Sequence, residues 1–391
     1  MMTVPLLDLK LQYATIREEC EHTLARLAAS QALILGQETT KLEKDLAEYC
    51  GCSYALGVSS GTDALLMALM ALDLEPGDEI IVPTYSFFAT AGVVTRLRAV
   101  PVFVDSDPVT CTIDPAGVEK AITSRTKAIM PVHLYGQSAD MTELLRIGAE
   151  HGIPLIEDAA QALGTQFKHG EKVGSMGLMG CYSFYPTKNL GAFGDAGLIT
   201  TNDDALYVKL KQMRNHGMEP RYYHKFVGGN FRIDEIQSGI LNVKFPHLES
   251  WHAARRRNAG LYKTAFLEKG LATDEGVTTF DAVNRVRLPK AVYKSDDVVN
   301  HHIYNQYVIH VEQRDELRAF LSTKGIGSEI YYPVPFHRQE CFRYLDPRDA
   351  DYPVANRLAA ETLALPIFPE LKPEQIAYVV DCIAEFMRSG S

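Results

Sequence analysis

One lysine stands out by its surroundings. Lys188 lies within residues 181–197, which read C-Y-S-F-Y-P-T-K-N-L-G-A-F-G-D-A-G. Thr187 and Asn189 flank it, so no charged side chain adjoins it in the sequence. A lysine of this kind can be a reactive amine that forms a Schiff base with a carbonyl. It can equally be an ordinary loop lysine beside a flexible turn, and the stretch alone does not decide between the two.

A second candidate is the segment S-S-G-T-D at residues 59–63, between an expected strand and an expected helix. The N-terminus of a helix offers free N–H groups and the positive end of the helix dipole, both of which suit a phosphate. Gly61 lets the backbone approach a ligand, and Ser60 and Thr62 add hydroxyl groups. Ser and Thr are also favoured as ordinary helix N-caps, so this segment by itself leaves both interpretations open.

A third candidate is E-D-A-A-Q at residues 157–161, at the end of an expected buried strand. A buried carboxylate such as that of Asp158 needs a partner to offset its desolvation. A cationic ring nitrogen would serve, and so would the N-terminus of the next helix.

The glycine run at residues 191–197, G-A-F-G-D-A-G, superficially resembles a dinucleotide-binding motif. That motif requires a helix after its last glycine, whereas residues 198–201 predict a strand. The run therefore disfavours a nicotinamide-dependent oxidoreductase. We expect its glycines to let the chain turn tightly past a bulky ligand.

These candidates follow short apolar runs that predict the strands of one sheet. Continuous apolar strands that alternate with helices indicate a parallel sheet covered on both faces. Ligands of such sheets bind outside the carboxyl ends of the strands. The expected strands are residues 54–58, 79–83, 100–104, 128–132, 153–156 and 198–201, and the expected helices between them are residues 63–72, 89–96 and 141–151.

The rest of the chain predicts N-terminal helices and a smaller second domain. We expect a large α/β domain over residues 1–250, including an N-terminal helical segment, and a small α+β domain over residues 251–391. Gly51 stands where a helix C-cap is expected. Outside the sheet we expect helices at residues 13–29, 39–49, 248–266, 315–323 and 373–388, strands at 302–311 and 328–332, and irregular structure at 272–300.

Composition excludes several classes of protein. The chain has 391 residues, 46% of them hydrophobic, and a net charge of -10 without long basic runs, which argues against nucleic acid or an anionic membrane as the main partner. No stretch approaches the roughly 20 apolar residues of a membrane span, and residues 1–10 lack the pattern of a signal peptide. The seven cysteines are dispersed, so we expect reduced thiols, no metal site and a cytoplasmic protein.

Taken together, the three candidates match the needs of pyridoxal phosphate (PLP). A helix N-terminus would hold the phosphate, a carboxylate would pair with the pyridine nitrogen, and a lysine would react with the aldehyde. The carboxylate would keep the ring nitrogen protonated, so that the ring acts as an electron sink.

The sequence closely resembles the DegT/DnrJ/EryC1/StrS family of PLP-dependent sugar-nucleotide aminotransferases, over nearly the whole chain. The resemblance implies fold type I, with a large three-layer α/β/α domain around a mostly parallel sheet and a smaller C-terminal α+β domain. The motifs that carry it are, in order, V-P-L-L-D-L, L-G-Q-E-T-T-K-L-E, V-S-S-G-T-D-A-L, P-G-D-E-I-I-V-P, H-L-Y-G-Q, I-E-D-A-A-Q-A-L-G, S-F-Y-P-T-K-N-L-G-A-F-G-D-A-G, R-N-H-G and G-G-N-F-R-I-D-E-I-Q.

The resemblance assigns roles to particular residues. Lys188 would carry the cofactor and shuttle protons, and Asp158 would pair with the ring nitrogen. Gln161 would hydrogen-bond the ring hydroxyl, and Phe87 would stack on the ring. The phosphate would be held by Ser60, Gly61, Thr62 and Ser183. Asn230 would reach the phosphate from the neighbouring subunit of a homodimer.

The resemblance also implies a reaction. Some relatives carry histidine in place of this lysine and dehydrate their substrate, so Lys188 favours transamination. L-glutamate would donate its amino group and a keto-sugar nucleotide would accept it, by a ping-pong mechanism, in amino-sugar biosynthesis for glycans or glycosylated metabolites. Residues expected at the sugar are Tyr185, His216, Tyr331, Tyr332 and His337.

The position aminated on the sugar has two candidates. Residues 331–339, Y-Y-P-V-P-F-H-R-Q, resemble the corresponding stretch of members that act on 3-keto sugars, although Tyr331 stands where that group often has histidine. We therefore expect a 3-keto hexose on dTDP or UDP, with a 4-keto hexose as the alternative. A non-catalytic PLP-fold protein that binds sugar nucleotides or regulates is a third interpretation, which Lys188, Asp158 and Gln161 disfavour.

Overall fold

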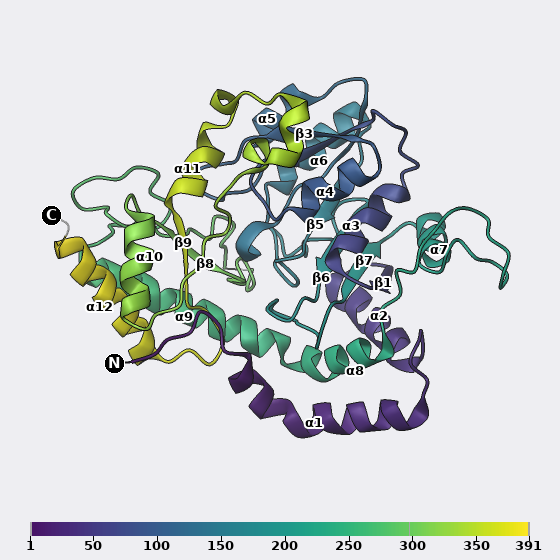
Figure 1. The fold of residues 1–391 in the computed structure, drawn as a ribbon, viewed down its shortest axis with the longest axis horizontal. Coiled ribbons are helices and arrows are strands. Elements are labelled where there is room, and N and C mark those ends of the chain that lie inside the picture. The colour runs from purple at the N-terminus through teal and green to yellow at the C-terminus, as the bar shows by residue number, and fades with distance from the viewer. Residues whose placement is uncertain (1, 297, 390–391) are drawn as a thin grey trace.

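The structure is a computed structural model that describes residues 2–296 and 298–389. Its centre is a mixed sheet wrapped by helices (Figure 1). One part has the strand order β1-β7-β6-β5 and the other β3-β2-β4, and the parallel bridges Ile129↔Leu155 and Val132↔Asp158 join them. The strands are β1 (Tyr54–Val58), β2 (Glu79–Pro83), β3 (Val100–Val104), β4 (Thr126–Ile129), β5 (Ile156–Asp158), β6 (Met179–Ser183) and β7 (Gly197–Thr201). Strand β7 runs antiparallel to both of its neighbours, β1 and β6, whereas β2 pairs parallel with β3 and β4, and β5 pairs parallel with β6.

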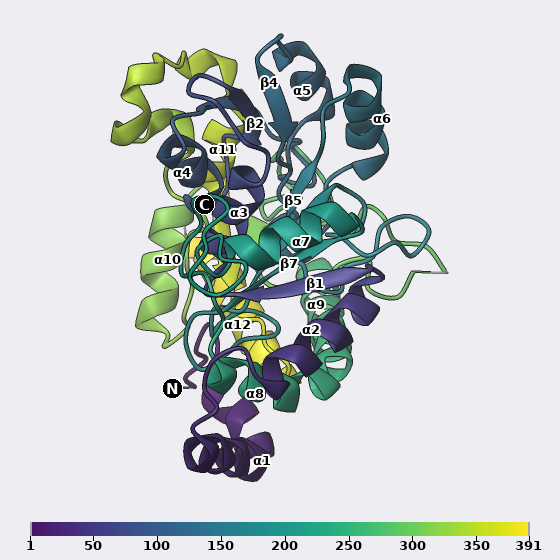
Figure 2. The ribbon, with the colours of Figure 1, turned by 90° about the vertical axis from the view of Figure 1, so that its right-hand side faces the viewer.

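Helices cover both faces of this sheet, and the alternation of side chains along β2 shows why. Ile80 and Val82 pack in one core with the first-face helices, whereas Ile81 packs in another core with second-face helices, because successive side chains of a strand point to opposite faces. The first face carries α3 (Gly61–Met70), α4 (Ala89–Arg96) and α7 (Asp204–Met213), and the second carries α2 (Gln37–Cys50), α5 (Pro115–Ala121), α6 (Met141–His151) and α8 (Glu235–Lys244). The predicted three-layer α/β/α arrangement is confirmed (Figure 2).

The N-terminal helix α1 (Leu9–Ser30) lies against α8, outside the sheet layers (Figure 1). Asp8 caps its start by accepting a hydrogen bond from the backbone N–H of Lys10. Gly51 ends α2 at φ 75°, as predicted, because glycine adopts this left-handed conformation without a steric penalty.

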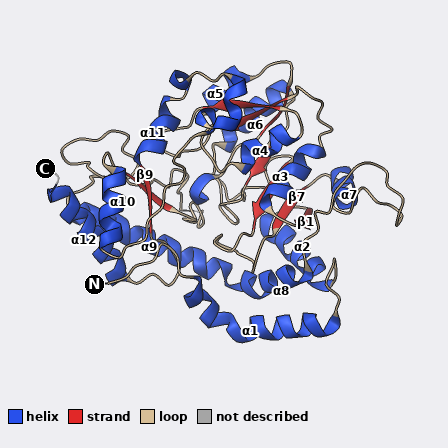
Figure 3. Ribbon diagram, viewed as in Figure 1, coloured by secondary structure: helices blue, strands red, loops and turns tan. Residues whose placement is uncertain are grey.

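The long helix α9 (Leu248–Glu268) leads from the sheet layers into the C-terminal part of the chain. That part has its own apolar core, which includes Tyr262, Ile309, Leu363 and Ile383. Its elements are β8 (Tyr307–His310), β9 (Thr362–Leu365), α10 (Arg314–Thr323), α11 (Pro353–Glu361) and α12 (Pro373–Ser389). Figure 3 shows the two red strands β8 and β9 set apart from the main sheet. The division of the chain at residue 250 stays a prediction.

Two predicted strands of the C-terminal part are wrong in extent. The strand expected at residues 302–311 is present only as Tyr307–His310, because the ring of His302 accepts a hydrogen bond from the N–H of Tyr304, which turns the chain at φ 45°. Residues 328–332 form a single bridge, Glu329↔Ala364, instead of a strand. Strand β9, which supplies that bridge, was not predicted.

The expected strand boundaries also shift in the main sheet. Residues 126–129 form β4 where 128–132 were expected, and residues 156–158 form β5 where 153–156 were expected. The helices α5, α7, α8 and α11 were not predicted. None of the helices within residues 2–296 and 298–389 combines the length and the apolar character that a membrane crossing needs.

Candidate active site

The phosphate-binding candidates from two distant segments meet at the carboxyl ends of the strands. Gly61 opens α3 after β1, and Ser183 ends β6; a Cβ at Gly61 would lie 2.6 Å from the Cβ of Ser183. Only glycine permits this approach without displacing its neighbour. Ser60 caps α3 by accepting a hydrogen bond from the N–H of Asp63 at 3.1 Å. The first N–H groups of α3, at Gly61 and Thr62, have no acceptor within the helix and are free to bind an anion.

Adjacent carboxylates at the end of β5 point to opposite faces of the sheet. Glu157 is fully buried, and its carboxylate accepts hydrogen bonds from the N–H groups of Gly174, Met176 and Gly177 at 2.6, 2.8 and 2.5 Å and contacts His133 at 2.9 Å. These contacts use the hydrogen-bonding capacity of the Glu157 carboxylate, so Glu157 is a structural residue of the interior.

Asp158 faces the other way, toward Lys188. Its Oδ2 accepts a hydrogen bond from the hydroxyl of Thr90 at 2.8 Å, and its Oδ1 accepts one from the N–H of Ala160 at 3.2 Å. Burial raises the pKa of this carboxyl group, whereas the two hydrogen bonds and Lys188 lower it. Each oxygen keeps a lone pair, so the group can still accept a cationic N–H.

Gln161 is oriented by the backbone. Its Oε1 accepts a hydrogen bond from the N–H of Tyr135 at 2.7 Å, and its Nε2 donates to the hydroxyl of Tyr332 at 3.0 Å. The N–H of Tyr135 can only donate, so it fixes which end of the amide is the oxygen. The second hydrogen of Nε2 remains for another acceptor, which suits a phenolic oxygen on a ligand.

Lys188 lies in the loop after β6, where its backbone N–H bonds the carbonyl of Tyr185 at 2.9 Å. Burial lowers the pKa of its ammonium group to about 8, while the charge of Asp158 raises it. The balance leaves the side chain as a free amine over an accessible pH range, and only the free amine attacks a carbonyl.

The lowered pKa predicts how cofactor attachment depends on pH. Below a pH of about 8, Lys188 is mainly an ammonium group and cannot react; above it, the amine is free. We expect the rate at which the apoprotein attaches PLP to rise through a midpoint near pH 8. Stopped-flow absorbance of PLP binding measures it. A midpoint near the ordinary lysine pKa of about 10.4 would show that the surroundings of Lys188 do not lower its pKa.

Aromatic residues border the same region. Phe87, between β2 and α4, is 57% exposed, and its ring centroid lies 6.1 Å from that of Tyr332. Tyr185 is also exposed. The position of Tyr332 is fixed by Tyr85, whose hydroxyl accepts the N–H of Tyr332 at 2.8 Å and donates to the carbonyl of Tyr331 at 2.6 Å. Exposed rings beside a reactive lysine suit stacking on a planar cofactor or on a sugar.

Three other predicted residues are not brought to Lys188 by any contact in the structure. His216 and Asn230 lie in the segment between α7 and α8, and both are exposed. Asn230 lies at the base of this loop, one residue before Phe231, whose carbonyl accepts a hydrogen bond from the N–H of Ser59 at 3.0 Å. The ring of His337 is buried with both nitrogens engaged, one with the hydroxyl of Thr84 at 2.8 Å and the other with Oδ1 of Asn356 at 3.0 Å. Their roles at phosphate and sugar stay predictions.

Thr90 is a positioning residue that the sequence did not reveal. It is fully buried at the start of α4, and its hydroxyl connects Ser86 at 3.1 Å with Asp158. Its only signal in the sequence is a threonine three residues after Phe87, in a helix that follows an expected strand.

Replacing Thr90 with Val should slow transamination by about 10-fold or more, the scale of one lost hydrogen bond to a charged group. Val keeps the volume and removes the hydroxyl, so the carboxylate of Asp158 loses one of its two protein donors. The rate of each half-reaction and the visible absorption of the bound cofactor measure the effect. Thr90→Ser, which retains the hydroxyl, should restore most of the rate; equal losses in both variants would show that packing alone matters.

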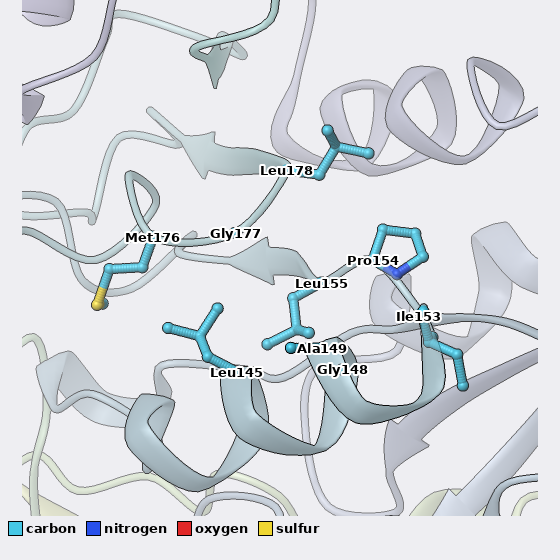
Figure 4. Close-up of a pocket in the computed structure, with 10 residues that line it drawn as sticks. Leu145, Gly148, Ala149, Ile153, Pro154, Leu155, Met176, Gly177 and Leu178 are labelled. Atoms are coloured by element: carbon cyan, nitrogen blue, oxygen red, sulfur yellow. The ribbon is translucent and has the colours of Figure 1, made fainter.

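A hollow of about 410 Å³ lies elsewhere (Figure 4). Its walls include Leu145 and Ala149 of α6, and Leu155 and Leu178, which directly precede β5 and β6. It therefore lies at the amino ends of these strands, whereas Asp158 and Ser183 lie at the carboxyl ends. Its lining residues carry no ionisable group, so this hollow is not the active site.

The residues at the carboxyl ends of the strands fit PLP. Gly61 and Ser183 form a close backbone cradle for a phosphate, and Asp158 presents a carboxylate for a pyridinium nitrogen. Gln161 retains a donor for the ring hydroxyl, and Lys188 has an amine of lowered pKa. Each group of the cofactor would thus meet a residue of matching chemistry.

Comparisons with known proteins agree with this fit. The profile of the DegT/DnrJ/EryC1/StrS aminotransferase family matches residues 14–384. A pleiotropic regulatory protein from Geobacillus stearothermophilus is 47% identical over 387 residues, which cover 99% of this chain and 99% of the relative. A UDP-N-acetyl-3-dehydro-alpha-D-glucosamine 3-aminotransferase from Acidithiobacillus ferrooxidans is 42% identical over 380 residues, which cover 97% of each chain.

A solved structure resembles the whole chain. The crystal structure of Streptomyces venezuelae DesV, in complex with a ketimine intermediate, is 38% identical and superposes with a TM-score of 0.90, covering 99% of each chain. A likeness over the full length of both chains includes the sheet, its helices and the C-terminal part. The chain belongs to the DegT/DnrJ/EryC1/StrS aminotransferase family and is a PLP-dependent aminotransferase of fold type I.

Proposed function

We propose that the protein transfers the amino group of L-glutamate to a keto-sugar nucleotide, at carbon 3 of a hexose carried by UDP or dTDP. The observation that carries the proposal is the Lys188 amine, of lowered pKa, beside Asp158 and Gln161. The Acidithiobacillus relative named for 3-amination supports the carbon. We take from that name only the position of amination, and neither the nucleotide nor the other substituents of the sugar.

PLP, when bound, supplies a carbonyl that accepts an amino group and a ring that takes up electrons. The residues of the chain do the rest. The amine of Lys188 would move a proton between the substrate carbon and the cofactor carbon, away from the substrate in the donor half-reaction and back to it in the acceptor half-reaction, and its pKa near 8 suits both directions. Asp158 would hold a positive charge at the ring nitrogen, and Thr90 positions Asp158 by its hydrogen bond.

The sugar is expected on the aromatic side of the site. Tyr185 is exposed three residues before Lys188, and Tyr331 and Tyr332 are held there by Tyr85. Tyr331 and Tyr332 lie in the stretch that resembles members acting on 3-keto sugars. Tyr331 replaces a histidine of that group, so amination at carbon 4 is the alternative that the assay must separate.

The site would be completed by a second copy of the chain. Asn230 is exposed in the segment between α7 and α8, and the resemblance implies that it reaches the phosphate of a neighbouring subunit. We infer a homodimer in which Asn230 of each subunit contacts the phosphate held by the other. Sedimentation of the Asn230→Ala variant, together with its affinity for PLP, tests this assignment.

The name of the Geobacillus relative favours a second candidate function, a regulatory protein that binds the cofactor without turnover. Both candidates predict a yellow protein whose cofactor borohydride fixes on Lys188. They differ in whether L-glutamate is consumed.

The assay mixes PLP-loaded protein, L-glutamate and a panel of 3-keto and 4-keto sugars on UDP and dTDP, and detects 2-oxoglutarate and the amino sugar. Amine at carbon 3 supports the proposal, and amine only at carbon 4 replaces it with the alternative. A labelled protein that releases no 2-oxoglutarate with any member of the panel would favour the regulatory function. The Lys188→Ala protein is the blank.

A further inference from the structure

Residues 184–192, which we call the Lys188 loop, fold back on themselves. A backbone hydrogen bond of 2.8 Å joins the last residue of the loop to the first. A Cβ on Gly191 would lie 2.3 Å from the carbonyl oxygen of Pro186, so no side chain fits where the two arms of the loop meet. The place of the Lys188 amine therefore depends on what holds this compact loop from outside.

Helix α8 supplies the first anchor of the loop. Lys244 on α8 is 4% exposed, and its Nζ donates a hydrogen bond to the carbonyl of Gly191 at 2.6 Å and lies 4.9 Å from the centroid of the Phe193 ring. Gln237 lies about two turns earlier on the same face of α8, and its Oε1 accepts the N–H of Phe193 at 2.9 Å. One face of α8 thus contacts the backbone shortly after Lys188.

The burial of Lys244 is energetically unfavourable. Charged groups are rarely buried without an opposite charge. In the part of the chain that the structure describes, this ammonium group meets a carbonyl and an aromatic ring but no carboxylate. Burial lowers its pKa to about 8, although the nearby Cys20 raises it. An apolar side chain would fill the same space without this penalty, so the hydrogen bond to Gly191 calls for an explanation.

The C-terminal part of the chain supplies the second anchor. Asn189 directly follows Lys188 and is buried, and its Nδ2 donates a hydrogen bond to the carbonyl of Ile303 at 3.1 Å. Ile303 lies in the segment before β8. The backbone after Lys188 is therefore held at two points, which α8 and the C-terminal part contribute independently.

We propose that Lys244 and Asn189 are positioning residues for the reaction, which fix the Lys188 loop so that the amine of Lys188 stays near Asp158 and shielded from water. Both act through the backbone of the loop. Loss of either anchor lets the loop move and water reach the amine. Burial lowers the pKa of Lys188 more than Asp158 raises it, so the pKa should rise when the shielding weakens. The inference rests on the role assigned to Lys188 and not on the identity of the sugar.

The test titrates Lys188 in the full-length apoprotein, without turnover. Acetic anhydride in limiting amount acetylates only unprotonated amines, so peptide mass spectrometry against pH gives the midpoint at Lys188. Lys244→Met keeps the length of the side chain but removes the donor, and should move this midpoint from about 8 to higher pH by about one unit or more, toward the ordinary lysine value of about 10.4. Asn189→Leu should move it in the same direction.

Lys244→Arg retains the charge and the donors and should restore a midpoint near that of the wild type, because a neighbouring hollow of about 220 Å³ gives the larger side chain room. Lys172→Met is the matched control. The Nζ of Lys172 also donates to a backbone carbonyl, that of Tyr49, lies 3.6 Å from the centroid of the Tyr49 ring, and has a pKa lowered by burial. Neither contact involves the Lys188 loop, so this variant should leave the midpoint at Lys188 unchanged.

A second readout uses the PLP-loaded protein. The rate at which L-glutamate discharges the cofactor should fall by about 10- to 100-fold in Lys244→Met, the scale of a small misplacement of a reacting group. Lys172→Met should keep the wild-type rate.

A labelling midpoint at Lys188 that is the same in the wild type, Lys244→Met and Asn189→Leu would overturn the inference. So would an equal shift in Lys172→Met, which would show that any lost lysine contact loosens the fold. A wild-type protein whose Lys188 responds to both anchor variants, but which transfers no amino group to any keto sugar, would overturn the proposed function instead and leave the two anchors supported.

Discussion

Replacing Lys188 with Ala should abolish amine transfer, lowering the rate by about 10⁴-fold, the upper end of what a positioned acid–base group contributes. The variant loses the amine that attaches the cofactor and the group that moves the proton. PLP should still bind, because the contacts proposed for Gly61, Ser183, Asp158 and Gln161 do not depend on the lysine. Measurement combines single-turnover kinetics with L-glutamate and the mass of the borohydride-reduced protein, which should carry no cofactor.

Two further variants make this result specific. Lys188→Arg preserves a cation of similar length, but a guanidinium group stays protonated, so it should be as inactive as Lys188→Ala. Lys41→Ala removes an exposed lysine that pairs with Asp45 on α2 and should leave the rate unchanged. Substantial turnover by Lys188→Ala would remove this residue from its role.

The sheet region was predictable because its signals are local. Apolar runs of five residues gave β1, β2 and β3 with the bounds found in the structure, and Gly51 marked the end of α2 by its left-handed backbone. The C-terminal part carries weaker signals. There a side chain, the ring of His302, bonds the backbone two residues on and ends a strand pattern that alternation alone would continue.

The contrast between local and long-range signals also explains which site residues were predicted from the sequence. Ser60, Gly61 and Asp158 were recognised because each follows a strand, and strand ends converge in a parallel sheet. The groups that orient them join residues far apart in sequence: Thr90 is 68 residues from Asp158, and Tyr135 is 26 residues from Gln161. Such partners are set by how the elements pack, so they produce no regular spacing of residues in the sequence.

Asp158→Asn should lower the transamination rate by about 10²- to 10³-fold, because breaking a buried ion pair costs about 3–5 kcal/mol. Asn is nearly isosteric but neutral, so the ring nitrogen of the cofactor loses the charge that keeps it protonated. The fold should persist. The N–H of Ala160 still finds an oxygen, and the hydroxyl of Thr90 can rotate to accept from the new amide.

The neighbouring carboxylate provides the matched control. Glu157→Gln replaces one carboxylate oxygen with an NH₂ group, which then opposes either the N–H of Gly174 or the N–H groups of Met176 and Gly177. It should lower the free energy of unfolding by about 1–3 kcal/mol with a far smaller effect on the rate. The two adjacent acidic residues are thus distinguished by experiment: replacement of Asp158 changes the reaction rate, and replacement of Glu157 changes the stability measured by urea unfolding.

A second consequence of Asp158→Asn concerns Lys188. The charge of Asp158 raises the pKa of that lysine against the effect of burial, so its removal should lower the pKa below about 8. The midpoint of the pH profile for cofactor attachment should therefore move to lower pH, although turnover is impaired. An unchanged midpoint in Asp158→Asn would show that Asp158 does not act on Lys188, and the pairing of these two residues at the cofactor would have to be abandoned.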